Sequence, residues 1–596
     1  HSLIAAQMVT QLRAELAGRL RRGVTVRDAY AYPTVRKLAA YLAPQLQESP
    51  TSEAEAADSQ SPGSVSSFGL SRAETSQQVF AAQSPWVRTT TAFLQLASTY
   101  LIYGVVSLPF LVFFLAARGW LFGDVSTGTL VAVMLGLSAL SWPVFMVVAI
   151  CAKWLIIGRY KAGSYPLWGF YHFRLWLVGR LTALSGAGAL VGTPLLPIYL
   201  RLLGARIGRG CTFDTALFGA WDLLSIGDDT SIGADTQALG YRVDGGRIHI
   251  GPVRIGSYCF IGNHACLGLH TQLGDHARLD DQSLLPDGHQ IPAGEAWRGA
   301  PATPGAVHIS ADAIGPETRR RPVLYGFLHL ILVEVLALFS LIPFLPFAFA
   351  LWAAWLWLRD TPALGIGLWL ISAGPLGVVM ACGYIALLKK IVLPRMQPGI
   401  YPVHSPTYLR KWLSDGIMRS SRAVLLPLYT TLYLPPYLRL LGAKIGPRAE
   451  LSSVWYFAPE LVEVAGESFF ADGSIVGGKR LFRGRFEVGK NRIGRRSFVG
   501  NSAILPTGTG LGDRCLLGVN SIPPVTPSAH GDCTRDGSEW LGSPAFALPR
   551  RPVVGNFDES VTFHPTRKLY LQRALIDGLR ILIPSYIGLG TGIAGL

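Results

Sequence analysis

The chain has 596 residues, of which 50% are hydrophobic and only 15% are charged, yet its net charge is +16. A single compact domain does not reach this length, so we expect several domains. A basic chain either binds nucleic acid or spans a membrane with its cations gathered on one side. Here the cations flank long apolar runs, as Lys153, Arg319 and Lys389 do, and no nucleic-acid-binding motif occurs. The composition therefore predicts a membrane protein without a nucleic-acid partner.

The cysteines stand singly, and none belongs to a CxxC pair. This pattern predicts neither a zinc site nor a disulfide framework, so we expect no metal. The chain starts without Met, shows no signal peptide and stops within the apolar stretch "LRILIPSYIGLGTGIAGL". We interpret it as a piece of a longer protein that continues at both ends.

In chain order, residues 1–45 predict a small helical piece and residues 46–88 a flexible linker rich in Ser, Ala, Gln and Glu. Apolar runs then follow that are long enough to cross a bilayer as helices, which takes roughly 20 residues. The first unit has a transmembrane helix pair, an amphipathic lead-in and a repeat domain, at 89–158, 159–203 and 204–310. The second unit has the same order, at 319–392, 393–442 and 443–550, and a third begins at 560–596 with a truncated transmembrane helix.

The distribution of charge predicts how the chain crosses the membrane. Short and nearly neutral connections join the two helices of each pair, whereas basic residues collect at the opposite ends. The positive-inside rule places those basic ends in the cytoplasm. Because each pair crosses twice, all soluble parts lie on that face. We therefore predict a multi-pass protein of the cytoplasmic (inner) membrane, in contact with membrane lipid and with its soluble domains in the cytoplasm.

The soluble parts are duplicated. "PIYLRLLGARIG" at 197–208 matches "PPYLRLLGAKIG" at 435–446, and "RIGSYCFIGN" at 254–263 matches "RIGRRSFVGN" at 492–501. A third copy starts near "TRKLYLQRALIDGLRILIP". The repeating unit is therefore a helix pair, a lead-in and a repeat domain.

Within each repeat domain an aliphatic residue returns at every sixth position, usually with Gly after it and a small residue four positions on. Neither a helix nor a simple strand has this period. It resembles the hexapeptide repeat of left-handed parallel β-helices, in which each hexapeptide forms one face of a three-sided coil and the aliphatic residue points inward. We attribute the glycine to a tightly turning backbone. The alternative is a generic apolar repeat in a β-sandwich. The two series are Ile255, Ile261, Leu267, Leu273, Leu279, Leu285 and Ile493, Val499, Leu505, Leu511, Leu517.

The resemblance to this fold implies acyl transfer from a thioester to an amine or hydroxyl. Enzymes of the fold usually assemble as trimers with sites between neighbouring coils. Since this chain carries two coils and begins a third unit, we expect an intrachain pseudo-trimer of β-helix domains.

Three histidines in the first repeat domain, His264, His270 and His276, are six residues apart. They therefore occupy three different faces of one coil and cannot share one metal ion. His264 is our candidate general base, because it follows an Asn that both copies keep. Asn263 or backbone N–H groups would then stabilise the oxyanion. The alternative is a partly exposed surface histidine, and the second copy has Ser502 at this position.

The first residues, "HSLIAAQMVTQLRAEL", resemble the modified-serine segment of peptidyl carrier domains, and "VTVRDAYAYPTVRKLAAYL" at 24–42 resembles their last helices. In that family the serine hydroxyl carries 4′-phosphopantetheine, which implies Ser2 here. The expected fold class is thus a multidomain membrane protein: a partial all-α carrier domain, transmembrane α-helices and two left-handed parallel β-helix domains.

A carrier followed by helix pairs and hexapeptide coils resembles the C-terminal region of the ε-poly-L-lysine synthetase family of nonribosomal peptide synthetases. The resemblance implies an amide-forming acyltransferase or ligase that joins carrier-bound aminoacyl thioesters to an amine acceptor. It also implies an upstream adenylation domain in the same chain. Basic monomers would need acidic groups, and two matched pairs are candidates, although loop acids capping turns are the simpler interpretation. These pairs are Asp222 with Glu460 and Asp275 with Asp513.

Two other functions stay open. One is a membrane-bound hexapeptide-repeat acyltransferase that uses acyl-coenzyme A. The other is a peptide exporter, for which Glu334 within the third apolar run is the main indication, because an acid at that depth is costly and often functional.

Overall fold

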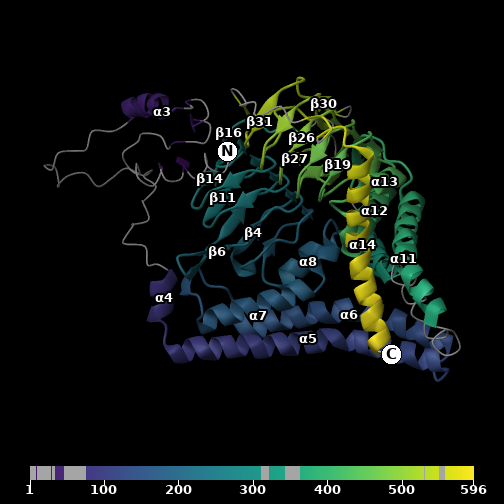
Figure 1. The fold of residues 1–596 in the computed structure, drawn as a ribbon. Helices are drawn as coiled ribbons and strands as arrows, with labels where there is room; N and C mark the ends of the chain where they lie inside the picture. Colours follow the sequence, from purple (N-terminus) through teal and green to yellow (C-terminus); the bar gives the residue numbers. More distant parts are fainter. Residues whose placement is uncertain are drawn as a thin grey trace.

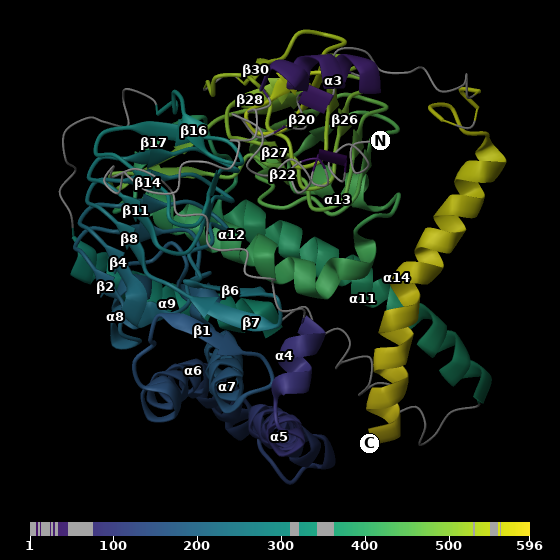
Figure 2. The same cartoon turned by 90° about the vertical axis from the view of Figure 1, so that its left-hand side faces the viewer.

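The structure is a computed structural model that describes residues 8, 9, 12, 24, 28, 29, 32, 34–45, 76–309, 321–341, 363–528, 531–548, 558–560 and 562–595. Two β-helices lie side by side, the first (206–304) in teal and the second (444–547) in green to yellow in Figure 1. Long helices lie beneath the first β-helix and beside the second (Figures 1 and 2).

Parallel sheets form the walls of the first β-helix. Leu273 pairs in parallel with Ile255, and Leu279 with Ile261, so strands eighteen residues apart are neighbours. Three hexapeptides therefore complete one coil, which confirms the β-helix and rules out the β-sandwich. The strand orders are β14-β11-β8-β4-β2, β16-β15-β12-β9-β5-β3 and β10-β13. The strands are β2 (Arg206–Ile207), β3 (Thr212–Phe213), β4 (Leu224–Ile226), β5 (Ser231–Ile232), β8 (Val253–Ile255), β9 (Phe260–Ile261), β10 (Cys266–Leu267), β11 (Thr271–Leu273), β12 (Arg278–Leu279), β13 (Leu284–Leu285), β14 (Gln290–Ile291), β15 (Ala296–Arg298) and β16 (Thr303–Pro304).

The second β-helix repeats this plan. Leu511 pairs in parallel with Ile493, and Leu517 with Val499. Its sheets are ordered β18-β20-β25-β28-β30, β19-β21-β26-β29-β31-β32 and β22-β27. The strands are β18 (Lys444–Ile445), β19 (Glu450–Leu451), β20 (Val462–Val464), β21 (Phe469–Phe470), β22 (Ile475–Val476), β25 (Asn491–Ile493), β26 (Phe498–Val499), β27 (Ile504–Leu505), β28 (Thr509–Leu511), β29 (Leu516–Leu517), β30 (Asp532–Cys533), β31 (Glu539–Leu541) and β32 (Phe546–Ala547).

The six-residue pattern places side chains as predicted, with one correction. The aliphatic residues of both series are buried, and so are the small ones such as Ala265 and Ala277. The glycines, however, serve close packing and not turning, because neither Gly256 nor Gly262 has a φ in the left-handed region. A Cβ on Gly256 would lie 2.6 Å from Asp275 Oδ1 in the next coil. Adjacent coils thus approach too closely there for any side chain.

Each β-helix carries one hairpin that interrupts the hexapeptide period. In the first unit this is β6 (Tyr241–Asp244) with β7 (Arg247–Ile250), which β1 (Gly163–Pro166) extends. In the second it is β23 (Arg480–Phe482) with β24 (Arg485–Val488), extended by β17 (Gly399–Pro402). The second hairpin packs on the first β-helix, as the ring contact between Phe482 and Phe260 shows.

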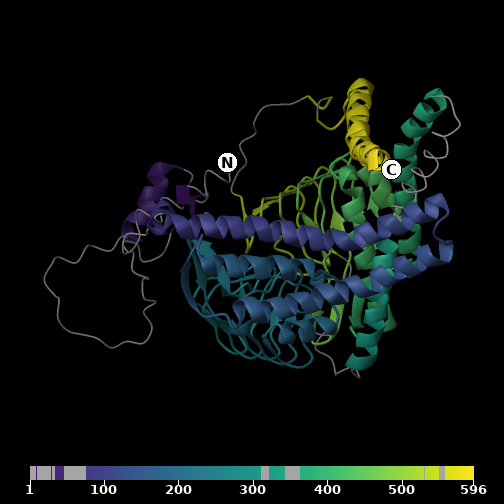
Figure 3. The same ribbon diagram turned by 90° about the horizontal axis from the view of Figure 1, so that it is seen from below.

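Four of the described helices are long and apolar enough to cross a membrane. They belong to α5 (Pro85–Phe122), α6 (Thr127–Ala152), α9 (Pro322–Leu341) and α11 (Ala363–Val392). Seen from below, the blue helices α5, α6 and α7 (Phe170–Leu184) lie against one another under the first β-helix (Figure 3). The fifth apolar run lies in α14 (Arg567–Gly595), which packs beside α11. Helix α14 is not among the four candidate spans, so a membrane crossing by α14 stays a prediction.

The predicted linker, 46–88, is wrong from residue 76 onward. Helix α4 (Ser76–Ala82) buries Val79 against the hairpin glycine Gly246, and α5 begins at Pro85. A short apolar face thus forms a helix in a segment whose composition predicted no regular structure. Residues 46–75 lie outside the described part of the chain. The remaining helical segments are α3 (Val35–Leu42), η1 (Ala43–Gln45), η2 (Lys153–Ile157), η3 (Ala187–Leu190), α8 (Leu195–Leu202), η4 (Trp221–Leu223), α12 (Pro406–Leu425), η7 (Leu426–Leu428), α13 (Leu434–Leu440) and η8 (Pro459–Leu461).

Candidate active site between the two β-helices

His264 occupies a corner of the first β-helix. Its φ of 55° is left-handed, as are those of His270 (58°) and His276 (61°) in the two turns that follow. The three histidines therefore stand at successive corners, as their spacing predicted. Two of them reach the second unit, since the His264 ring lies 6.2 Å from that of Tyr456 and His276 Nδ1 is 3.2 Å from Arg483 Nη2.

The nearest acid to His264 is Asp235, which occupies the same corner one coil earlier. His264 Nε2 lies 3.5 Å from Asp235 Oδ2, and the histidine side chain is 27% exposed. Burial lowers the pKa of His264 below its usual value, while the charges of Asp235 and Asp281 act in the opposite direction. The imidazole is therefore neutral at pH 7, which is the state that a general base requires.

Asn263 has a structural role that its prediction did not include. Its side-chain Oδ1 accepts a hydrogen bond from Ala234 N at 2.7 Å, and its backbone N–H donates to Asp281 Oδ1 at 2.7 Å. Asn263 thus continues the ladder of side-chain caps that joins neighbouring coils. Its Nδ2 faces Gly478 of the second β-helix, 3.6 Å from where a Cβ would lie. Only this NH₂ group is left for an oxyanion.

A cavity of about 250 Å³ opens between the two β-helices, one coil beyond Asn263. Arg480 of the second hairpin reaches into it and lies 2.9 Å from Asp280 and 3.5 Å from Asp281. Burial raises the pKa of Asp280, and the Arg480 charge opposes this effect. The remaining lining comes from both units: Arg298, Ala306 and His308 from the first, and Pro506, Ile522, Pro523, Pro524, Val525, Thr526, Pro527, Ser543, Pro544 and Ala545 from the second.

Buried charges hold the two units together beside the candidate site. Lys479 Nζ lies 2.9 Å from Asp214 of the first unit and 3.4 Å from Asp415 of α12. Burial works against ionisation of Asp415, but Lys411 and Lys479 outweigh it and lower the pKa of that carboxyl. Helix α12 passes close to the first unit (Figure 2), where Trp412 donates a hydrogen bond to Val191 O at 2.7 Å. Ion pairs and a hydrogen bond thus join the second unit to the first.

The matched acids bind partners within the chain. Asp222 lies 2.9 Å from Lys153 Nζ, and Glu460 lies 2.7 Å from Lys389 Nζ, so both do bind an ammonium group, but an internal one. Asp275 caps Ser257 N in the preceding coil at 2.7 Å, as Asp513 caps Arg495 N. The simpler interpretation of turn-capping acids is therefore correct for the second pair.

Glu334 pairs within the helix bundle. Its carboxylate accepts hydrogen bonds from Trp142 Nε1 and from Ser138 Oγ, both on α6. This acid therefore joins the two helix pairs.

Ser2 lies outside the described residues. Among the described residues of 1–45, a small apolar cluster brings together the two segments that resemble a carrier domain. Val9 of the first segment is buried with Val24 and Leu38 of the second. This packing fits a helical domain.

Sequence reasoning missed Asp235 and the second-unit residues around His264. Asp235 lies 29 residues before His264 and not eighteen, because the hairpin 240–251 interrupts the coil. The duplication predicts two coils, but not how they pack, so it does not identify Tyr456 or Lys479. Ser502, the counterpart of His264, also lies at this interface and accepts a hydrogen bond from Gln282 through its backbone oxygen at 3.2 Å.

Comparisons with known proteins agree with the hexapeptide repeat and with the resemblance to a poly-amino-acid synthetase. Residues 490–522 match the family described as "Hexapeptide repeat of succinyl-transferase". The chain is 32% identical over 457 residues to the Delta-poly-L-ornithine synthetase of Acinetobacter baumannii, a match that covers 75% of this chain and 34% of that protein. The chain thus spans about a third of the length of the curated relative, and it is similar to a poly-amino-acid synthetase while carrying hexapeptide repeats.

Two solved acyltransferases overlap with parts of the chain. One is AntD, an N-acyltransferase from Bacillus cereus, with 11% identity, a TM-score of 0.15, and coverage of 25% of this chain and 99% of that one. The other is a maltose O-acetyltransferase from Clostridium difficile 630, with 13% identity, a TM-score of 0.13, and coverage of 29% and 89%. Overlaps of this extent carry no argument about function.

Proposed function

We propose that this chain is the amide-forming part of a membrane-bound poly-amino-acid synthetase of the nonribosomal type. The observation that carries the proposal is the 32% identity to Delta-poly-L-ornithine synthetase over 75% of the chain. The placement of His264 supports it, because the side chain lies against Tyr456 of the second unit and is still 27% exposed.

In the proposed reaction His264 is the general base. Asp235 beside Nε2 favours the tautomer with its hydrogen on that nitrogen, which leaves the lone pair on Nδ1 for the substrate. The amine nitrogen attacks the thioester carbonyl carbon while His264 takes its proton. The C–N bond forms, the C–S bond breaks, and the protonated imidazole returns the proton to the leaving thiolate. Asn263 Nδ2 donates to the carbonyl oxygen as negative charge develops, and holding both substrates at one interface lowers the barrier by proximity.

Ser2 is the proposed attachment point of 4′-phosphopantetheine. The apolar cluster around Val9, Val24 and Leu38 supports a helical carrier domain there. When bound, this group would supply the thiol that holds the aminoacyl unit as a thioester. An upstream adenylation domain in the full-length protein would load it.

The helix pairs are proposed to anchor the protein in the cytoplasmic membrane with both β-helices on the cytoplasmic side. The four candidate spans support membrane association. Their basic ends, Lys153 and Lys389, form ion pairs with Asp222 and Glu460 of the β-helix domains. Each β-helix therefore lies against the basic end of its helix pair.

Replacement of His264 tests the proposal in the full-length protein. His264→Asn keeps a residue that tolerates the left-handed turn, and His270→Asn is the matched control at the next corner. We expect His264→Asn to lose amide formation by about a hundredfold or more with thioester loading unchanged, and His270→Asn to retain both. Equal activity of the two variants would refute the role of His264.

A hexapeptide acyltransferase that uses acyl-coenzyme A is the second candidate, which the match of 490–522 to a succinyl-transferase repeat favours. Ser2→Ala separates the two. It should abolish product formation by the assembly-line mechanism, whereas an enzyme that uses acyl-coenzyme A would be unaffected.

A further inference from the structure

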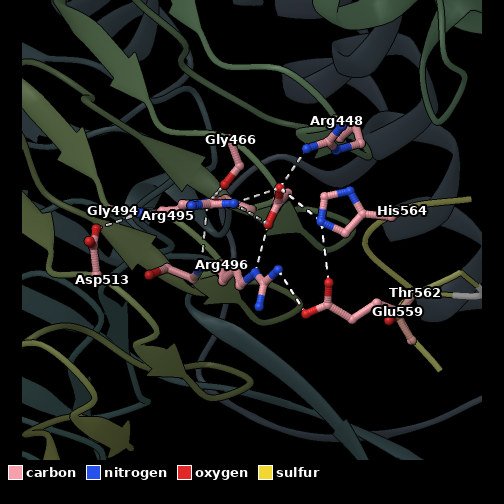
Figure 4. Close-up of polar contacts among 12 residues, drawn as sticks. Arg448, Gly466, Gly494, Arg495, Arg496, Asp513, Glu559, Thr562 and His564 are labelled. Carbon is pink, nitrogen blue, oxygen red and sulfur yellow. Dashed lines mark hydrogen bonds and ion pairs between the residues drawn. The ribbon is translucent and has the colours of Figure 1, made fainter. Parts of the chain in front are cut away.

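An arginine cluster stands at one corner of the second β-helix, where the first β-helix has none. Glu467 is buried at its centre, with Arg448 Nη2 at 2.7 Å, Arg495 Nη2 at 2.9 Å and Arg496 Nε at 2.6 Å (Figure 4). Hydrogen bonds from Arg496, then Arg448 and Arg495, hold the pKa of Glu467 far below its usual value. The glutamate is therefore an anion at any physiological pH.

The duplication shows that the fold does not require these arginines. Gly210, Ser257 and Tyr258 occupy the positions of Arg448, Arg495 and Arg496 in the first unit. The turns are alike, since φ is 59° at Tyr258 and 55° at Arg496. A β-helix corner of the same shape thus forms without the cluster, so the arginines need another explanation.

The cluster borders a cavity of about 640 Å³ between the second β-helix and the start of α14. Among the described residues that line it are Arg439, Arg448, Arg567 and His564, and no carboxylate. Of the described carboxylates, Glu467 and Glu559 pair with three of the five arginines at and beside the cavity. An excess of three positive charges therefore remains on these five arginines. They are Arg439, Arg448, Arg495, Arg496 and Arg567. The cavity therefore suits an anion.

An apolar surface continues from the cavity along α14. Tyr570 and Leu571 line the cavity. Leu571, Leu575, Leu579 and Ile583 follow at intervals of four, so they share one face of the helix, and each is more than half exposed. The opposite face packs on the protein, where Asp577 accepts a hydrogen bond from Leu432 N at 2.9 Å and Ile581 is buried.

We propose that this cavity binds the phosphate of an anionic phospholipid whose acyl chains lie along the exposed face of α14. A cationic cavity that leads into an apolar helix face matches such a lipid in charge and in shape. The bound lipid would link α14 to the second β-helix at the membrane surface. This site is separate from the proposed active site and does not depend on the proposed function.

Lipid titration of the purified full-length protein in detergent, followed by native mass spectrometry, tests the proposal. The probes are phosphatidylglycerol, phosphatidylcholine and inorganic pyrophosphate. We expect phosphatidylglycerol to bind with preference over phosphatidylcholine, and the Arg448→Gln/Arg567→Gln variant to bind it about 25-fold more weakly, at about fivefold for each arginine. Arg206→Gln/Arg254→Gln, which removes two exposed arginines of the first β-helix, is the matched control and should bind as the wild type does.

A second variant separates a lipid from a soluble phosphate compound. Leu575→Ser/Leu579→Ser should weaken phosphatidylglycerol binding and leave pyrophosphate binding unchanged. Unchanged lipid binding in the arginine variant would overturn the site. The ligand would instead be a soluble phosphate compound if Arg448→Gln/Arg567→Gln weakens pyrophosphate binding while Leu575→Ser/Leu579→Ser leaves lipid binding unchanged. That result would overturn the proposal of a lipid. Both variants keep Arg495 and Arg496 on Glu467, and a thermal unfolding curve checks that they fold.

Discussion

Two buried ion pairs, Lys153 with Asp222 and Lys389 with Glu460, connect the apolar helices to the β-helices. The second unit also has an exposed ion pair, which serves as a control for the contribution of the buried pair to the free energy of unfolding. Lys389 and Glu460 lie 2.7 Å apart with side chains 1% and 9% exposed. Lys444 and Glu463 have nearly the same separation, 2.8 Å, but are 77% and 31% exposed. The chemistry is the same in both pairs and only burial differs.

Removal of one partner should therefore have very different effects. Lys389→Met leaves the Glu460 carboxylate buried without a counter-charge, which costs about 3–5 kcal/mol. Lys444→Met leaves Glu463 in water beside Arg492 and should cost about 0.2–1 kcal/mol. The double variant Lys389→Met/Glu460→Met removes both charges and should be more stable than Lys389→Met alone, because no buried charge remains.

Equilibrium unfolding of the protein in detergent, followed by tryptophan fluorescence, measures these free energies. The reasoning fails if Lys389→Met and Lys444→Met lose the same stability. The single variant Glu460→Met completes the cycle. The reasoning also fails if the stability loss of Lys389→Met/Glu460→Met equals the sum of the losses of Lys389→Met and Glu460→Met, since additivity would mean that the two groups do not interact.

Three further predictions follow from packing and charge. Gly256→Ala should destabilise the first β-helix by about 1–3 kcal/mol because its Cβ would meet Asp275 at 2.6 Å, whereas Gly179→Ala in α7, where nothing lies within 4 Å, should be neutral or stabilising in the same unfolding assay. Amide formation should persist below the ordinary imidazole value of 6.5 and fall only at lower pH, because burial lowers the pKa of His264 and protonation removes the base; a pH–rate profile that falls above 6.5 would contradict this. Lys479→Met should leave Asp214 and Asp415 facing each other without their shared cation and loosen the contact between the units, which faster amide hydrogen exchange in 188–192 would report.

The sequence predicts the coils well because the signal is local. Each hexapeptide needs one inward aliphatic residue, so Ile255 and Ile261 identify successive faces without knowledge of their neighbours. The glycines show the limit of this reasoning. Their spacing was visible, but the reason for Gly256 is a contact with Asp275 in the next coil, which only the stacking of coils reveals.

The candidate site was predicted only in part for the same reason. His264 stood out by its neighbours in sequence. Asp235 shares its corner in the adjacent coil, but the hairpin of the first unit changes their separation from eighteen to 29 residues, so the six-residue period does not identify it. The contact of Lys479 with Asp214 joins residues 265 positions apart and depends on how two separate β-helices pack. Periodicity carries no information about such contacts, and composition misjudged α4 because a single buried Val79 decides its position.

The duplication also leads to a last prediction, on the expected third unit. The second hairpin covers Phe260 of the first β-helix, which is 2% exposed beneath Phe482. Phe498 is the counterpart of Phe260 in the second β-helix and is 37% exposed, stacked on the exposed Phe469. If a third unit places its hairpin on the second β-helix, Phe498 becomes a core residue in the full-length protein. Phe498→Ala should then cost about 3–5 kcal/mol there, the loss that we also expect for Phe260→Ala, and much less in the 596-residue chain. Equal and small losses for Phe498→Ala in both proteins would show that this face remains open to solvent and would rule out the pseudo-trimer.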